Sequence, residues 1–191
     1  MNFEFLLEYV HKWFTFQTWY RRSMYLERIN KAIWNNTIKV LSWLRRVWKS
    51  YILKQIITDL LNKKVSLENI FYLHLEDERL LNSDISILRD VFEYYKKNYY
   101  KSWVIYVFLD EIQNITWWEK FVRNLQETYE NNIQIFITWS NSNLLSSELS
   151  SVLTWRFIEF SIYPFSFKEF LELKQIELDS LDPKKYELFN E

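Results

Sequence analysis

The chain has 191 residues, of which 49% are hydrophobic and 26% charged, with a formal net charge of -1 and no cysteine. This balance predicts a globular domain with a real core and excludes a disordered chain. The near-neutral charge excludes a global field that would recruit nucleic acid or anionic membrane, and the lack of cysteine excludes disulfides and thiolate metal sites. The N-terminus lacks a basic signal-peptide region and no apolar run can span a bilayer, so we expect a cytoplasmic protein without a membrane partner.

Helical and strand patterns alternate along the chain. Apolar spacing predicts helices over 3–13 and 23–33. The run at 104–109 is rich in β-branched and aromatic residues, which is typical of a strand buried on both faces of a parallel sheet. The alternation predicts an α/β fold with a doubly wound sheet whose ligands bind where the strands end. The other predicted elements are strands at 38–41, 69–75, 133–138 and 157–161, helices at 50–61, 83–99, 118–129 and 143–149, and a last helix capped by Ser166.

The most unusual property of the chain is that it contains no glycine and ten tryptophans. Average glycine usage predicts roughly 13 glycines at this length. Some bacterial lineages read the codon UGA as glycine, and a translation that assigns UGA to tryptophan would write Trp at those positions. We therefore consider two forms, the printed chain and a glycine form that has glycine at many of the tryptophan positions.

The first predicted strand leads into a candidate phosphate-binding loop. The segment from Trp43 to Ser50 becomes G-x-x-x-x-G-K-S when Trp43 and Trp48 are read as glycine. In such a loop, backbone N–H groups wrap the phosphates, Lys49 contacts the β- and γ-phosphates, and Ser50 binds Mg²⁺. Without this context, an ordinary strand–helix turn ending in Lys-Ser is the alternative. The predicted nucleotide-binding residues are Trp43, Leu44, Arg45, Arg46, Val47, Trp48, Lys49, Ser50 and Tyr51.

Glycine matters in this loop because the backbone adopts positive φ and lies close to the phosphate. In the printed chain, we expect the indole of Trp48 to occupy the phosphate space.

A second candidate motif is the apolar strand that ends in Asp110 and Glu111. After a phosphate-binding loop, this pattern predicts that Asp110 holds Mg²⁺ through its water shell. Glu111 is then predicted to orient and polarise the attacking water. The alternative is a strand that simply ends in a solvated acidic turn.

Two further positions follow later strands. Ser140 or Asn141 is predicted to contact the γ-phosphate or the catalytic water, and an Asn-Ser turn without a catalytic part is the alternative. Arg156 is predicted to supply charge to the γ-phosphate in a neighbouring subunit, as an arginine finger does, and a structural salt bridge is the alternative.

Together these segments resemble the prokaryotic AAA-type ATPases that carry a DUF4143 domain at the C-terminal side. The resemblance covers roughly residues 20–175 and requires glycine at Trp43, Trp48, Trp139 and Trp155. It implies a P-loop NTPase three-layer sandwich with a parallel five-stranded sheet of order 5-1-4-3-2, and ATP and Mg²⁺ as cofactors. It also implies a missing C-terminal domain. With the helices predicted from apolar spacing, we expect a helical segment at 1–34, an ATPase core at 35–175, and the start of a linker to the missing domain at 176–191. The segments that carry it are 41–50, 73–77, 108–114, 137–142, 153–156 and 163–170.

The remaining tryptophans and the two histidines are interpreted more simply. The resemblance suggests that Trp117 stands for glycine and that Trp118 is genuine, with Trp34 and Trp103 as further candidates for glycine. Trp13 and Trp19 stay unassigned. His11 and His74 lack the partner spacing of a metal site, so we expect surface or strand histidines.

The leading hypothesis is a Mg²⁺-dependent ATPase that tryptophan in the loop impairs. One alternative is a non-catalytic interaction module with the same fold. The other is a nucleic-acid-associated protein that uses arginine pairs with neighbouring aromatics. The sequence leaves open whether the chain forms a homo-oligomer. It also leaves open whether a protein or DNA partner binds through the missing C-terminal domain. The arginine pairs are Arg21 with Arg22 and Arg45 with Arg46.

Overall fold

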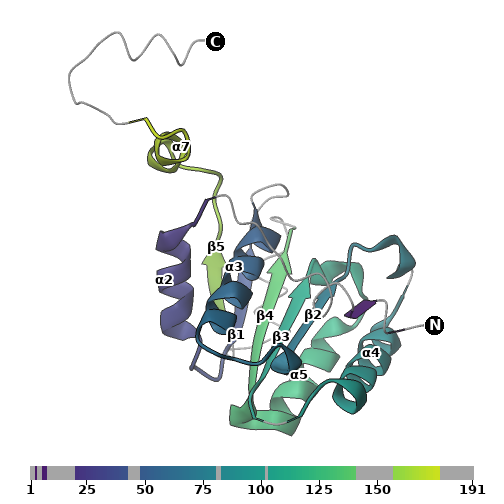
Figure 1. The fold of residues 1–191 in the computed structure, drawn as a ribbon. Coiled ribbons are helices and arrows are strands. Elements are labelled where there is room, and N and C mark those ends of the chain that lie inside the picture. The colour runs from purple at the N-terminus through teal and green to yellow at the C-terminus, as the bar shows by residue number, and fades with distance from the viewer. Residues whose placement is uncertain are drawn as a thin grey trace.

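The computed structural model describes residues 3, 6–7, 20–42, 48–80, 83–101, 103–140 and 157–176. Its centre is a five-stranded sheet in the order β2-β3-β4-β1-β5, and every neighbouring pair of strands is parallel (Figure 1). This is the order 5-1-4-3-2 taken from the other edge, so the predicted topology is confirmed. The strands are β1 (Ile38–Ser42), β2 (Ile70–His74), β3 (Ile105–Asp110), β4 (Ile133–Trp139) and β5 (Phe157–Ser161).

Helices cover both faces of this sheet. Successive strand residues point to opposite faces, so Val107 joins the core under α4 and α5 while Phe108 joins the core under α2 and α3. Each face thus buries its own apolar layer, which gives the three-layer arrangement of Figure 1. The helices are α2 (Ser23–Ala32), α3 (Lys49–Asn62), α4 (Ile85–Asn98), α5 (Trp118–Tyr129) and α7 (Phe167–Leu173), with short 3-10 turns η1 (Leu67–Asn69), η2 (Glu78–Leu80), η3 (Ile112–Asn114) and η4 (Glu130–Asn132).

The predicted elements agree with this structure wherever it is described. The predicted helix over 118–129 and the predicted strand over 157–161 have the observed bounds, and the other described elements after residue 20 differ from prediction by one or two residues at their ends. Ser166 caps α7 in a capping box with Glu169, as predicted. The predicted helix at 143–149 and most of the one at 3–13 lie outside the described residues.

The parallel register gathers the C-terminal ends of the strands at one edge of the sheet. His74 is level with Asp110 across β2 and β3, and Leu41 is level with Thr138 across β1 and β4. The helix α3 begins just after β1 at this edge (Figure 1). The predicted division into 1–34, 35–175 and 176–191 stays a prediction, although α2 packs in the same core as α3.

Candidate nucleotide-binding site

The start of α3 brings two predicted ligand-binding side chains to the end of β3. Lys49 is 3% exposed, and its Nζ lies 3.9 Å from Oε1 of Glu111. The hydroxyl of Ser50 makes a hydrogen bond with the carboxylate of Asp110. The structure therefore assembles Lys49, Ser50, Asp110 and Glu111, four of the residues predicted from the sequence.

Asp110 is fully buried and held by several hydrogen bonds. Thr138 Oγ1 donates to its Oδ1 at 2.5 Å, and Tyr72 OH donates to its Oδ2 at 3.0 Å. Burial raises the pKa of Asp110, but the hydrogen bonds from His74, Thr138 and Ser50 outweigh it, and the pKa lies below its ordinary value. The group is thus a carboxylate. One carboxylate beside one hydroxyl suits Mg²⁺, which takes few protein ligands and keeps water and phosphate oxygens for the rest.

His74 is the histidine that the sequence analysis assigned no role. Its Nδ1 lies 3.4 Å from Oδ2 of Asp110, and the hydrogen bond with that carboxylate raises the pKa of His74 above its ordinary value. A cavity of about 390 Å³ opens beside the pair and is lined by Leu6, Ser50, Lys54, Tyr72, Leu73, His74, Asp77, Arg79 and Asp110. Polar side chains and space for solvent therefore lie directly beside the candidate metal ligands.

Glu111 follows Asp110 and has a strained backbone, with φ of 59°. Its N–H donates to Thr138 Oγ1 at 2.7 Å, which fixes the turn at the end of β3. Its carboxylate lies between Lys49 on one oxygen and Gln113 on the other, where Gln113 Nε2 donates to Oε2 at 2.6 Å. The same Nε2 donates to Ser140 Oγ at 2.9 Å, so the structure also brings the candidate sensor Ser140 to this site.

Three tryptophans have the backbone conformation that glycine adopts without cost. The φ values are 68° for Trp48, 79° for Trp103 and 62° for Trp117, and the three side chains are exposed. Positive φ is an outlier for a bulky residue. The conformation therefore supports glycine at these positions, as the sequence analysis expected.

Trp139 and Trp34 differ from those three. Trp139 was expected at a turn that favours glycine, but it is the last residue of β4, is buried, and is absent from the positive-φ residues of the described chain. The expectation was wrong in this respect, because β4 extends one residue further than predicted. Trp34 is exposed, and its φ is not positive either. The backbone gives no reason for glycine at these two positions.

The indole of Trp48 packs edge-on against two neighbouring rings. Its centroid lies 5.3 Å from that of Tyr51 and 5.9 Å from that of Phe165. Whether it also fills the phosphate space stays a prediction, because the loop at 43–47 lies outside the described residues. Asn141 and Arg156 lie outside them as well, so their catalytic roles stay predictions.

The first arginine pair of the nucleic-acid hypothesis is engaged inside the protein. Arg22 is 1% exposed and binds both carboxylate oxygens of Glu169, at 2.9 and 3.0 Å. Arg21 binds both oxygens of Asp59 at 2.7 Å. The charges of Arg21 and Arg22 are therefore already paired with carboxylates inside the protein, which argues against their use in nucleic-acid binding. The second pair, at 45 and 46, lies outside the described residues.

Four site residues were missed from the sequence: Tyr72, His74, Gln113 and Thr138. Tyr72, His74 and Thr138 reach the acidic pair from other strands, so the register across the sheet reveals them, whereas Gln113 lies two residues after Glu111. The available signals were weak: His74, Gln113 and Thr138 lie within segments that carry the family resemblance, at 73–77, 108–114 and 137–142.

Comparisons with known proteins agree with this fold. An uncharacterized protein of Haemophilus influenzae is 37% identical over 160 residues, which are 83% of this chain and 39% of that protein. Uncharacterized protein MJ1544 of Methanocaldococcus jannaschii is 39% identical over 148 residues, which are 75% of this chain and 30% of that protein. The chain thus spans less than half the length of these curated relatives.

Structural similarity and a family model complete the comparison. The crystal structure of Saccharomyces cerevisiae RIF2 matches with a TM-score of 0.51 at 15% identity, covering 98% of this chain and 76% of that chain, which shows a shared fold alone. The family model of the AAA domain matches residues 35–171, well over half of the chain. The chain therefore belongs to the AAA domain family, whose P-loop fold binds nucleotides.

Proposed function

We propose that this chain is a Mg²⁺-dependent module that binds and hydrolyses ATP. The observation that carries the proposal is the convergence of Lys49 and Ser50, at the start of α3, with Asp110 and Glu111, at the end of β3. These are the four groups that phosphoryl transfer to water needs: a cation for the phosphates, two oxygen ligands for the metal, and a carboxylate for the water.

Each side chain has a distinct role in this mechanism. Ser50 and Asp110 would hold Mg²⁺, and when bound, that ion neutralises charge on the β- and γ-phosphates. Lys49 would place its ammonium on the same phosphates. Glu111 orients a water for in-line attack and polarises it. Lys49 Nζ lies 3.9 Å from Glu111 Oε1, so a bound phosphate would compete with this carboxylate for the ammonium.

The printed chain is predicted to perform this function poorly. Trp48 directly precedes Lys49 and has a φ of 68°, and a bulky residue in that region costs about 1–3 kcal/mol. Glycine relieves this cost and lets a phosphate approach the backbone. We therefore expect tight ATP binding only in the glycine form.

The test compares ATP affinity between the printed chain and the double variant Trp43→Gly/Trp48→Gly. We expect the double variant to bind labelled Mg-ATP at least about 10-fold more tightly, or about 1.4 kcal/mol, because glycine removes the indole that is predicted to occupy the phosphate space. The control is Trp103→Gly/Trp117→Gly, which relieves the same kind of strain outside the predicted loop and should leave affinity unchanged. Equal, tight binding by the printed chain and the loop variant would overturn the decoding argument.

Hydrolysis is tested in the loop variant by Glu111→Gln. The amide keeps the shape of the side chain but cannot act as a base, so we expect ATP to bind while turnover falls at least about 100-fold. A Glu111→Gln protein that hydrolyses ATP as fast as its parent would show a different mechanism. A loop variant that binds ATP without any turnover would favour the non-catalytic module.

A further inference from the structure

One amide links the two groups that the proposed mechanism assigns to water and to the γ-phosphate. Gln113 lies in η3, directly after Glu111, and its Nε2 donates both to Glu111 Oε2 at 2.6 Å and to Ser140 Oγ at 2.9 Å. In return, the N–H of Ser140 donates to Gln113 Oε1 at 3.4 Å. The nitrogen and the oxygen of the Gln113 amide thus both make hydrogen bonds, and together these bonds connect the end of β3 with the end of β4.

The position of this link follows from the fold. Glu111 is anchored by its N–H on Thr138 of β4, which leaves the carboxylate to be oriented by its own two contacts. Lys49 lies 3.9 Å from Oε1, and Gln113 binds Oε2. A bound phosphate would compete with Glu111 for the ammonium of Lys49. The hydrogen bond from Gln113 to Oε2 of Glu111 would not be affected by this competition.

We propose that Gln113 is a positioning residue that fixes the rotamer of Glu111 for water activation and couples it to Ser140. This inference rests on the proposed ATPase function and adds to it a route by which the end of β4 controls the carboxylate. A group that binds Ser140, such as the γ-phosphate, would shift the hydrogen bonds of the amide and thereby the orientation of Oε1. The spacing of the motifs does not require a coupling between Ser140 and Glu111. The separate roles of Asp110 and Glu111 do not require it either.

The test uses Gln113→Leu and Gln113→Glu in the Trp43→Gly/Trp48→Gly chain. Leucine removes the amide, while glutamate keeps its shape but lacks the N–H donor, so both should misorient Glu111. We expect kcat to fall about 10- to 100-fold in both, with KM and the Kd for Mg-ATP within about 3-fold of the parent. Glutamate also places a second carboxylate against Glu111, and the two charges repel each other. A purely structural role would instead lower stability or Mg-ATP affinity together with kcat.

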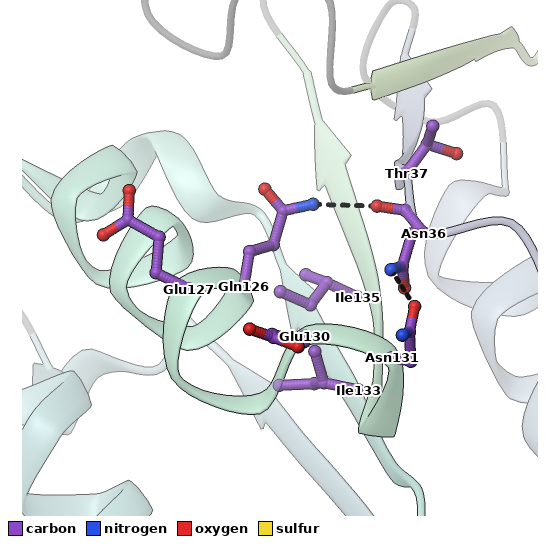
Figure 2. Close-up of a pocket in the computed structure, with 8 residues that line it drawn as sticks. All are labelled: Asn36, Thr37, Gln126, Glu127, Glu130, Asn131, Ile133 and Ile135. Atoms are coloured by element: carbon purple, nitrogen blue, oxygen red, sulfur yellow. Dashed lines mark hydrogen bonds between the residues drawn. The ribbon is translucent and has the colours of Figure 1, made fainter.

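The matched control is Gln126→Leu, at the opposite edge of the sheet. Figure 2 shows Gln126 in a cavity of about 470 Å³ beside the start of β4, where it donates to the carbonyl oxygen of Asn36 at 3.2 Å. It is a glutamine whose amide also donates a hydrogen bond between elements, but at the opposite end of the strands, so kcat should not change.

Coupling to Ser140 is tested by the double variant Gln113→Leu/Ser140→Ala. If the amide transmits the effect of Ser140, the double variant should be less than about 2-fold slower than Gln113→Leu alone, because contacting residues are not additive. Unchanged kcat in both single Gln113 variants, or full additivity in the double variant, overturns the inference. If the parent itself has no turnover, the ATPase proposal fails and this inference fails with it. If the parent hydrolyses ATP and the Gln113 variants do so equally fast, the inference alone fails.

Discussion

At the scale of single residues, two adjacent tryptophans occupy opposite environments. Trp117 is the residue before α5, with a φ of 62° and a side chain that is 59% exposed. Trp118 is helical, 6% exposed, and packs on Trp139 with ring centroids 5.6 Å apart. The backbone at 117 favours glycine, whereas the core at 118 needs a large side chain. Backbone conformation and burial therefore distinguish Trp117 from Trp118, in the way the family resemblance suggested.

This difference predicts opposite effects of the same substitution. Trp117→Gly relieves a strain of about 1–3 kcal/mol. It also loses a contact with Lys120, whose Nζ lies 4.1 Å from the ring centroid, worth about 0.5–1 kcal/mol. We expect a net gain of about 1 kcal/mol in the free energy of unfolding. Trp118→Gly should lose about 3–5 kcal/mol through the cavity it leaves. Urea unfolding measures both, and a Trp117→Gly protein less stable than the printed chain would contradict the assignment.

At the scale of elements, α7 is tied to the chain before α2 by a buried ion pair. Arg22 binds Glu169 through two hydrogen bonds, and it also donates to the carbonyl oxygen of Tyr163 at 2.8 Å. Burial raises the pKa of Glu169, but the hydrogen bonds from Arg22 and Ser166 bring it below its ordinary value. The carboxylate thus caps α7 and neutralises Arg22 at once. In Figure 1, α7 lies beyond the end of β5.

Removing the charge of Glu169 should therefore loosen α7. Glu169→Gln leaves Arg22 buried without a counter-charge, and breaking one side of such a pair costs about 3–5 kcal/mol. We expect faster amide hydrogen exchange in α7 than in α3, together with lower stability. The control is Lys168→Gln, because Lys168 is 86% exposed and a surface pair contributes at most about 1 kcal/mol. Equal exchange in both variants would show that the pair does not anchor the helix.

The elements were more predictable than the contacts between them. Apolar spacing predicted the bounds of α5 and β5, and Ser166 predicted the start of α7, because such signals act within a few positions of the chain. The contacts of Asp110 with Tyr72 and Thr138 join residues 38 and 28 positions apart, and no local pattern specifies that register. The strand end at Trp139 was misplaced for a related reason: pairing with β1, which places Ser42 level with Trp139, extends β4 past the last residue of its apolar run.

At the scale of the whole molecule, the sheet has one charged residue at the edge away from the site. Lys39 of β1 is fully buried, and its Nζ donates to the carbonyl oxygens of Ile33 and Asn35, at 3.0 and 2.7 Å, and to Gln134. Burial lowers the pKa of Lys39 to about 7. The two ends of the sheet thus differ: acidic groups lie where the strands end, and a buried amine lies near where they begin.

This amine should make global stability depend on pH. Because the pKa of Lys39 is lower in the folded chain than in the unfolded chain, the unfolded state binds more protons above pH 7, and the free energy of unfolding rises with pH there. The gain is lost progressively as pH falls from about 10.5, the ordinary pKa, and is gone below about 7. The three acceptors around Nζ favour the ammonium and oppose part of this effect. We expect the printed chain to gain about 1–2 kcal/mol over Lys39→Met between pH 7.5 and 9.5. Urea unfolding of both proteins across this window measures the difference, in which other titrating groups cancel. Parallel curves would mean that Lys39 stays charged in the core, held by its acceptors.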